Sequence, residues 1–192
     1  MIFRPRASVM SPVIYRIDCD DRIVGVNEGW HDFARNNAEG LEVADEKVVG
    51  SELWSAISDA TIQHLYRLIV DRARAGKLVR FHYRCDAPGF RRLFEMSVER
   101  VGSDVVFTST LQSEEPRKPV VLLEANRTRG AETIRMCSWY QKVFGEQGAW
   151  IPVEEAVESM QLLAKVPMPR ITHGICEPCL AGMLKVLGQA KD

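Results

Sequence analysis

The sequence predicts an α+β fold in which an antiparallel sheet carries helices on one face. Short segments rich in β-formers come in pairs joined by tight polar turns, which favours hairpins and therefore antiparallel strands. One longer amphipathic segment separates the first two of these strands from the last three. Because an amphipathic helix must bury its apolar stripe, we expect the helices to pack together against the sheet.

The fold is predicted to begin with a hairpin and a short helix. Two β-rich segments flank the turn Cys19-Asp20-Asp21, as in a hairpin. Asn27 closes the second strand and is a good N-cap, and Trp30 and Phe33 follow it at helical spacing. The expected elements are strands over 13–18 and 22–27, a helix that ends at Asn36-Asn37, and a helical turn over 52–57.

A longer helix and three more strands are predicted to complete the sheet. Ser58 or Asp59 caps the helix, its apolar residues form a single stripe, and Gly76 stops it after about Ala75. The strands that follow alternate between apolar and polar residues, so each is expected to bury one face. These strands are expected over 78–85, 93–101 and 105–111.

The order of these elements over residues 13–113 resembles that of a PAS domain. Arg22 to Phe33 is similar to the PAS pattern in which a strand ends in Asn and opens a helix with an aromatic residue, and Val49 to Trp54 looks like its "G-x-x-L/W" turn. The resemblance implies a five-stranded antiparallel sheet with the two N-terminal strands in its middle. It also implies a sensory or regulatory protein, with any small-molecule ligand held between helices and sheet.

Composition divides the rest of the chain into an N-terminal arm, a linker and a C-terminal tail. Residues 1–12 contain two prolines and little pattern, so they are expected to form an arm. Residues 114–132 are expected to link the sensor domain, 13–113, to a small tail, 133–192, which is expected to be mainly helical. The tail helices are expected to start at Pro152 and near Pro178.

A set of soft metal-ligand residues occurs in this tail. Three thiols and an imidazole are the usual donors of a closed tetrahedral zinc site. The tail resembles a module that follows some bacterial PAS domains and reads Cys-Ser-x-Cys, then a Trp-containing stretch, then His-Gly-Ile-Cys-Pro-x-Cys. Tyr140 stands where that module has its second Cys, which puts a four-thiolate site in doubt. The donors expected here are Cys137, His173, Cys176 and Cys179, with zinc in a structural role.

Other interpretations of the candidate residues stay open. One is that the cysteines are ordinary buried thiols, or that the missing Cys has removed the site. Another is a redox switch in which Cys176 and Cys179 form a disulfide. A third is a haem or flavin sensor, since some PAS domains bind haem through a His on the long helix, where His64 stands. His64 falls outside the apolar stripe, however, and is expected to face solvent.

Arginines gather at one end of the predicted sheet. Arg80, His82 and Arg84 share one face of a strand, and Arg91 and Arg92 open the next strand. One hypothesis is that they bind a carboxylate of a ligand or partner, because guanidinium pairs with carboxylate in bidentate geometry. The alternative is a solvated outer face balanced by acidic residues of the same sheet.

The charge and hydropathy of the chain do not favour binding to nucleic acid or to a membrane. The formal net charge is −1, from 25 basic and 26 acidic residues, which gives no general attraction to nucleic acid or to an anionic membrane. No apolar run approaches the ~18 residues of a membrane span, and the N-terminus lacks the apolar stretch of a signal peptide. We therefore expect a cytoplasmic protein with reduced cysteines.

No catalytic constellation and no output domain is recognisable in the sequence, so an enzyme is not expected. A sensor of this kind must pass its signal to another polypeptide. We expect a homodimer that acts through protein–protein contact on a separate output protein.

Overall fold

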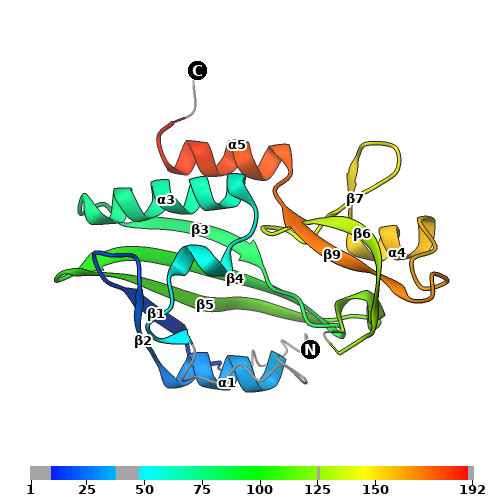
Figure 1. The fold of residues 1–192 in the computed structure, drawn as a ribbon, viewed down its shortest axis with the longest axis horizontal. Coiled ribbons are helices and arrows are strands. Elements are labelled where there is room, and N and C mark those ends of the chain that lie inside the picture. The colour runs from blue at the N-terminus through cyan, green and yellow to red at the C-terminus, as the bar shows by residue number, and fades with distance from the viewer. Residues whose placement is uncertain (1–9, 38–47, 125, 190–192) are drawn as a thin grey trace, which may run out of the picture.

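The computed structural model describes residues 10–37, 48–124 and 126–189. These ranges form a larger sheet with a smaller sheet beside it, and the last helix runs alongside the longest one (Figure 1). The expected N-terminal arm falls largely outside the described residues. Among the helices of these ranges, none has the length and apolar character needed to cross a membrane.

The larger sheet has five strands in the order β2-β1-β5-β4-β3, and every pairing is antiparallel. This confirms the predicted α+β fold with a five-stranded antiparallel sheet. Alternate residues of β4 and β5 are buried, as the alternation of apolar and polar residues predicts. The strands are β1 (Val13–Ile17), β2 (Ile23–Val26), β3 (Val79–Arg84), β4 (Phe90–Val101) and β5 (Asp104–Pro116).

One detail of the predicted sheet is wrong. Both N-terminal strands were placed in its middle, whereas β2 forms an edge and β5 lies at the centre. β5 is 13 residues long and pairs along both of its sides, with β1 and with β4. β2 has only 4 residues and pairs with β1 alone among the described strands. A short strand of this kind is suited to a sheet edge, where few backbone groups are left unpaired.

Three helical segments cover one face of this sheet. The helix α3 is capped by Asp59, whose side chain accepts a hydrogen bond from Ile62 N at 3.0 Å, and Gly76 follows it with φ +78°. Both ends agree with the prediction. Rings of the helices meet rings of the sheet, as in the contact of Tyr66 with Phe107 at 6.4 Å. The segments are α1 (Glu28–Asn37), η1 (Leu53–Ala56) and α3 (Ala60–Arg74).

The C-terminal part contains a second sheet, which corrects the prediction of a mainly helical tail. Its four strands lie in the order β8-β7-β6-β9, and β6 and β9 are parallel. Ile134 and Met136 are buried on β6 while Arg135 between them is exposed, which is the period of a strand. The elements are β6 (Arg129–Cys137), β7 (Val143–Phe144), β8 (Trp150–Ile151), α4 (Val153–Ser159), β9 (Met168–Gly174) and α5 (Glu177–Val186).

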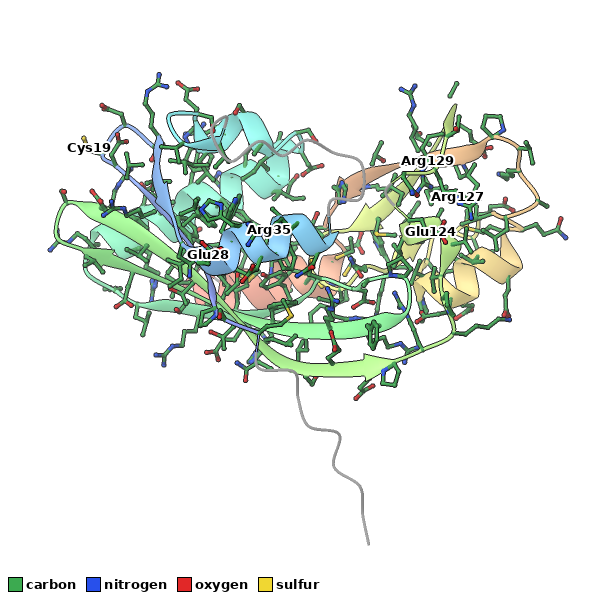
Figure 2. All side chains as sticks on the ribbon, turned by 90° about the horizontal axis from the view of Figure 1, so that it is seen from below. Cys19, Glu28, Arg35, Glu124, Arg127 and Arg129 are labelled. Atoms are coloured by element: carbon green, nitrogen blue, oxygen red, sulfur yellow. The ribbon has the colours of Figure 1, made fainter. Side chains whose placement is uncertain are left out.

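The segment expected to be a linker is built into this structure. β5 extends to Pro116, β6 begins at Arg129, and the short helix η2 (Val121–Leu123) lies between them. Leu122 is fully buried in a small core of the second sheet. Arg129 donates hydrogen bonds to the carbonyl oxygens of Leu122 at 2.7 Å and of Glu124 at 2.9 Å. Figure 2 labels Arg129 and Glu124, which lie close together.

The main hydrophobic core is shared between the two parts of the chain. It combines residues of the first sheet and α3 with buried residues of the tail. Arg72 on α3 also donates a hydrogen bond to the carbonyl oxygen of Leu187, after the end of α5, at 2.9 Å. The tail therefore completes the core formed by the first sheet and α3. Its contributions to that core are Cys137, Trp139, Ile175, Cys176, Met183 and Leu187.

Asn27 joins the first strand to α1, and its loss should be measurable. Its Oδ1 accepts hydrogen bonds from Trp30 N and Ile14 N, both at 2.9 Å, and its Nδ2 donates to Pro12 O at 2.8 Å. We expect Asn27→Ala to lower the free energy of unfolding by about 1 to 2 kcal/mol, since the helix loses its cap and a strand amide loses its acceptor. Urea denaturation measures this change, and an unchanged midpoint would contradict it.

Candidate metal centre and adjoining cavity

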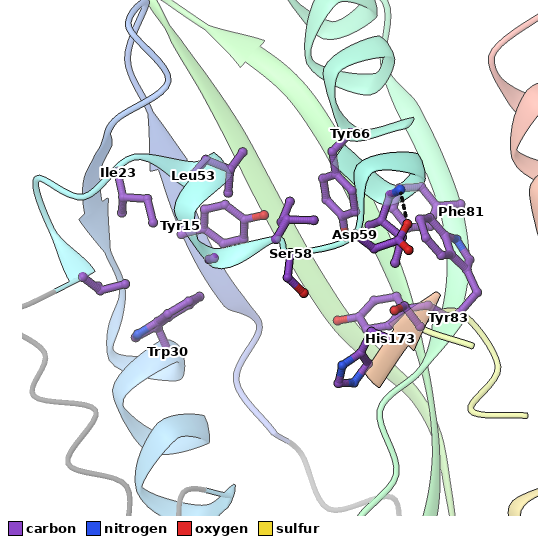
Figure 3. A pocket seen from close by; sticks show the side chains of 16 residues that line it. Tyr15, Ile23, Trp30, Leu53, Ser58, Asp59, Tyr66, Phe81, Tyr83 and His173 are labelled. Atoms are coloured by element: carbon purple, nitrogen blue, oxygen red, sulfur yellow. Dashed lines mark hydrogen bonds between the residues drawn. The ribbon is translucent and has the colours of Figure 1, made fainter. Parts of the chain in front are cut away.

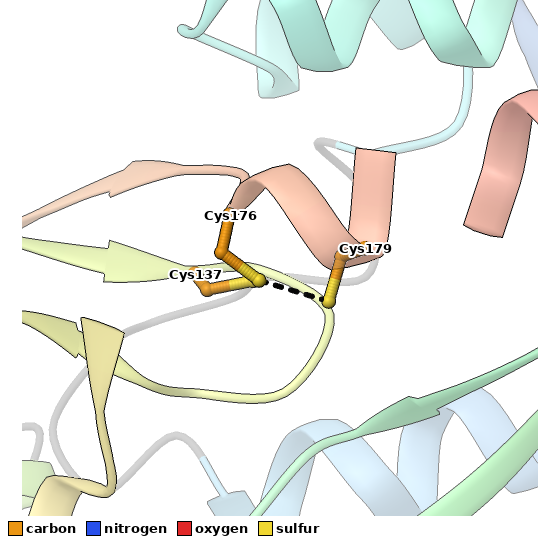
Figure 4. A group of neighbouring side chains, drawn as sticks. All are labelled: Cys137, Cys176 and Cys179. Atoms are coloured by element: carbon orange, nitrogen blue, oxygen red, sulfur yellow. Dashed lines mark hydrogen bonds between the residues drawn. The ribbon is translucent and has the colours of Figure 1, made fainter. Parts of the chain in front are cut away.

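Three of the four predicted metal donors come together in the structure. Cys137 ends β6, Cys176 stands at the N-cap position of α5, and Cys179 lies in the first turn of that helix (Figure 4). Their sulfur atoms all lie within 4.8 Å of one another. The Sγ–Sγ distance is 3.7 Å between Cys137 and Cys176 and 3.2 Å between Cys176 and Cys179.

The parallel pairing of β6 with β9 brings these residues together across a long stretch of chain. Cys137 is paired in register with Gly174, two residues before Cys176. After Cys137 the chain makes a tight turn, in which Gln141 N donates to Cys137 O at 2.8 Å and Gln141 has φ +51°. Ser138 N then donates to Gly174 O at 2.8 Å, which ties this turn to the start of α5.

The surroundings of Cys137 favour its thiolate form. A hydrogen bond from Cys179 and backbone N–H groups of Cys176, Tyr140 and Trp139 lower the pKa of Cys137 to about 5, against the opposing effect of burial. The same contact with Cys137, together with burial, raises the pKa of Cys179 far above its usual range. The cluster thus has one favoured thiolate beside a protonated partner, and a bound cation would displace the remaining protons.

The arrangement fits a thiolate-preferring metal ion such as zinc. At a Zn–S distance of about 2.3 Å, the edges of a tetrahedral site measure about 3.8 Å between sulfurs. The 3.7 Å separation of Cys137 and Cys176 matches such an edge, and the 3.2 Å contact needs only a small opening. Backbone amides already directed at Cys137 would support its thiolate in the loaded site.

The two predicted histidines lie elsewhere. His173 is exposed on β9, opposite Met136 in the pairing, and lines a cavity beside the first sheet rather than joining the thiols. The described residues therefore do not form a four-donor set that includes His173. His64 is exposed on α3, as its position outside the apolar stripe predicts, which does not favour it as a haem ligand.

A cavity of about 400 Å³ lies between the sheet and its helices (Figure 3). We call it the ring cavity, because its walls include Tyr15, Trp30, Tyr66, Phe81 and Tyr83. The cavity lies where the resemblance implies a ligand site, between the helices and the sheet. The sequence does not reveal that Ser138, Trp139 and His173 of the tail complete the walls. The one signal in the sequence is that Trp139 stands two positions after the predicted donor Cys137.

Burial of the ring cavity keeps its tyrosines neutral. Desolvation raises the pKa of Tyr66 to about 12, and it also raises the pKa of Tyr15 and of Tyr83. A hydrogen bond of 2.8 Å between the Tyr83 hydroxyl and Ser109 offsets part of this rise in the pKa of Tyr83. The cavity therefore offers apolar surface with neutral hydroxyl groups.

Alkaline titration should show this burial. Unfolded tyrosine ionises near pH 10, so between about pH 10 and 12 the unfolded state releases a proton that folded Tyr66 keeps. We expect the contribution of Tyr66 to stability to be complete below pH 10 and to fall by up to about 1.4 kcal/mol per pH unit above it. Phenolate absorbance of native protein, compared with Tyr66→Phe, measures the retained proton. An ionisation step assigned to Tyr66 near pH 10 would contradict the prediction.

A buried ion network joins the first sheet to the tail. The Asp86 carboxylate is fully buried and accepts hydrogen bonds from Arg84 and, at 3.0 Å, from Arg117. Arg117 also pairs at 2.8 Å with Glu154 of α4, which pairs with Arg91. Most of the arginines proposed to bind an external carboxylate are thus paired within the protein. The sequence alone gives no sign of this role for Asp86.

Comparison with known proteins adds a distant likeness of fold. No family model and no curated protein matches this chain. A domain of an HTR-like protein from Haloarcula marismortui is similar at 16% identity and a TM-score of 0.37, covering 53% of this chain and 98% of that one. A sensory box sensor histidine kinase from Vibrio cholerae is similar at 12% identity and a TM-score of 0.39, covering 55% and 85%. Neither supplies a site or an activity to this chain.

Proposed function

We propose that this chain is a regulatory sensor, in which the ring cavity binds a small planar molecule and the metal-held tail transmits the bound state. The observation that carries the proposal is the position of Trp139. This residue lies two positions after Cys137 and forms part of the cavity wall. Its ring lies 5.8 Å from Phe81 and 6.1 Å from Tyr66, measured between ring centroids. A ligand in the cavity would therefore contact the tail directly.

Cavity size and chemistry indicate the ligand class. About 400 Å³ is within the range of small-molecule sites. Within the described residues, the Nε1 atoms of Trp30 and Trp139 are buried and have no hydrogen-bond acceptor. Because such groups are normally paired, we propose a planar ring compound that carries an acceptor oxygen.

Transmission would follow from shared backbone contacts. Arg84 N, at the end of β3, donates to Trp139 O at 2.6 Å, so movement of Trp139 is coupled to the first sheet and to the turn that carries Cys137. A ligand that binds one arrangement of this turn better than another shifts the population toward it. Zinc held by Cys137, Cys176 and Cys179 would join the end of β6 to the start of α5.

The proposed regulatory role also requires partner chains. We propose a cytoplasmic homodimer that acts on a separate output protein and performs no catalysis itself. Sedimentation of zinc-loaded and chelator-treated protein tests the coupling. We expect the dimer dissociation constant to differ between the two samples, and equal constants would contradict transmission through the tail.

Binding in the ring cavity can be tested with the apolar fluorescent probe N-phenylnaphthylamine. Ala56 lines the cavity from η1 and is exposed, so Ala56→Trp should fill the space with little strain on the core. We expect this variant to weaken probe binding at least tenfold. Ala60→Trp is the matched control, because Ala60 is exposed at the start of α3 and is not part of this cavity wall. Equal probe affinity in the two variants would exclude the cavity as the binding site.

A thiol switch is a second candidate, favoured by the 3.2 Å separation of the sulfurs of Cys176 and Cys179. In the metal-free protein a peroxide would accept two electrons from the pair, and the two thiols would lose their protons and form one S–S bond. Thiol counting after mild peroxide treatment should then fall by two relative to untreated protein. An unchanged count would remove this candidate.

A further inference from the structure

The thiol cluster is built from two turns with the same spacing. In one turn Cys176 and Cys179 stand three positions apart, and in the other Cys137 and Tyr140 have the same separation. Three of these four positions carry sulfur, and the fourth carries a phenol. Among the described residues no histidine, carboxylate or further thiol joins the group. A tetrahedral ion held here would thus lack one ligand from the described protein.

The position without a thiol adjoins a second cavity, of about 500 Å³. We call it the thiol cavity, because Cys176 and Cys179 lie in its wall together with Tyr140. Cys137 is fully buried and is not part of this wall. The incomplete side of the cluster is therefore the side on which space is available.

The wall of the thiol cavity carries positive charge. Arg80 and Lys142 line it, and no ion pair with a carboxylate is found for either within the described part of the chain. His82 also lines it and lies 3.7 Å from Glu95. Apolar side chains such as Phe81, Met183 and Val186 form the rest of the wall. A ligand that fits this cavity has an anionic group and a short apolar body.

We propose that the metal ion held by Cys137, Cys176 and Cys179 takes its fourth ligand from solution, and that this ligand is a small thiol bearing a carboxylate. This inference rests on the proposed metal site. Sulfur suits an ion already bound by soft thiolates, and the carboxylate would reach Arg80 or Lys142. On binding, the thiol releases its proton to solvent and its sulfur occupies the fourth position, with no electron transferred.

Cobalt(II) in place of zinc makes this testable, because its visible absorption reports the ligands around the ion. The probe is mercaptoacetate, added to the cobalt-loaded full chain. We expect saturable changes in the visible bands in the wild type and in Tyr140→Phe. We expect no change in Tyr140→Cys, in which the new thiol fills the position. Mercaptoethanol, which lacks the carboxylate, should bind about threefold less tightly, and the double variant Arg80→Gln/Lys142→Gln should remove that difference.

Failure of the metal site and failure of the open position are distinguishable. Wild-type protein that binds no cobalt would overturn both. Protein that binds one cobalt ion but shows no response to mercaptoacetate would overturn only the open position. The inference would also be overturned if His82→Ala or Tyr140→Phe changed the spectrum before any thiol is added, since that residue would then be the fourth ligand. A change in the visible bands when mercaptoacetate is added to Tyr140→Cys would also overturn the inference.

Discussion

Asp86→Ala is expected to lower the free energy of unfolding by about 3 to 5 kcal/mol, the usual cost of removing one partner from a buried ion pair. The carboxylate is fully buried and the Arg117 side chain is only 6% exposed, so the guanidinium would lose a partner that water cannot replace. Asp86 Oδ1 also accepts a hydrogen bond from Arg92 N at 2.9 Å, which would be left without its acceptor. Urea denaturation with a fixed m-value measures the loss.

Asp32→Ala is the matched control for this prediction. Asp32 pairs with Arg35 on α1, but both side chains are more than half exposed, so the change should be within about 1 kcal/mol. A comparable loss in the two variants would show that burial of Asp86 is not the cause. Because Arg117 also contacts Glu154, the Asp86 variant should additionally loosen α4, which hydrogen exchange of that helix would detect.

Removal of zinc is expected to destabilise the protein by about 4 kcal/mol when free zinc is about 1,000 times its dissociation constant. The melting temperature should then fall by about 8 to 16 °C in a chelator, given the usual sensitivity of a chain of this length. The effect arises because the three thiols come from β6 and α5, which the ion would hold together only in the folded state. Differential scanning calorimetry with and without chelator measures it.

Two cysteine variants separate a metal effect from a general effect of losing a thiol. Cys176→Ser should abolish both the bound zinc and the response to chelator. Cys19→Ser should change neither, because Cys19 is exposed at the turn between β1 and β2 (Figure 2) and is not a member of the cluster. If chelator leaves the melting temperature of the wild type unchanged, the cluster holds no stabilising metal.

The larger sheet could be predicted because its signals are local. Alternation along β4 and β5, the turn at Cys19 to Asp21, and the cap and stop of α3 each depend on neighbouring residues. The same is true of α5, whose start near Pro178 was predicted. The sulfur cluster could also be proposed from residue type and spacing, although its assembly depends on tertiary structure.

Other features depend on contacts between distant parts of the chain, which a single sequence does not show. β6 has a short alternating pattern, and its parallel partner β9 begins about thirty residues after it ends. The pairing of Arg117 with Asp86 spans 31 positions. His173 was expected with the thiols because three thiols and an imidazole are the usual zinc donors and because it belongs to the His-Gly-Ile-Cys-x-x-Cys run. In the structure it pairs with Met136, the residue before Cys137, and neighbouring side chains on a strand point to opposite faces, so it does not join the thiols.

The sharing of one core between the two parts of the chain has a practical consequence for protein engineering. Receptors whose input and output halves fold independently can be recombined by cutting between them. Here a fragment that stopped at the end of β5 would leave the surfaces that Trp139 and Met183 cover in contact with water. A chimaera that joins this sheet to a foreign effector would have to retain α5, and the joint would belong after Leu187.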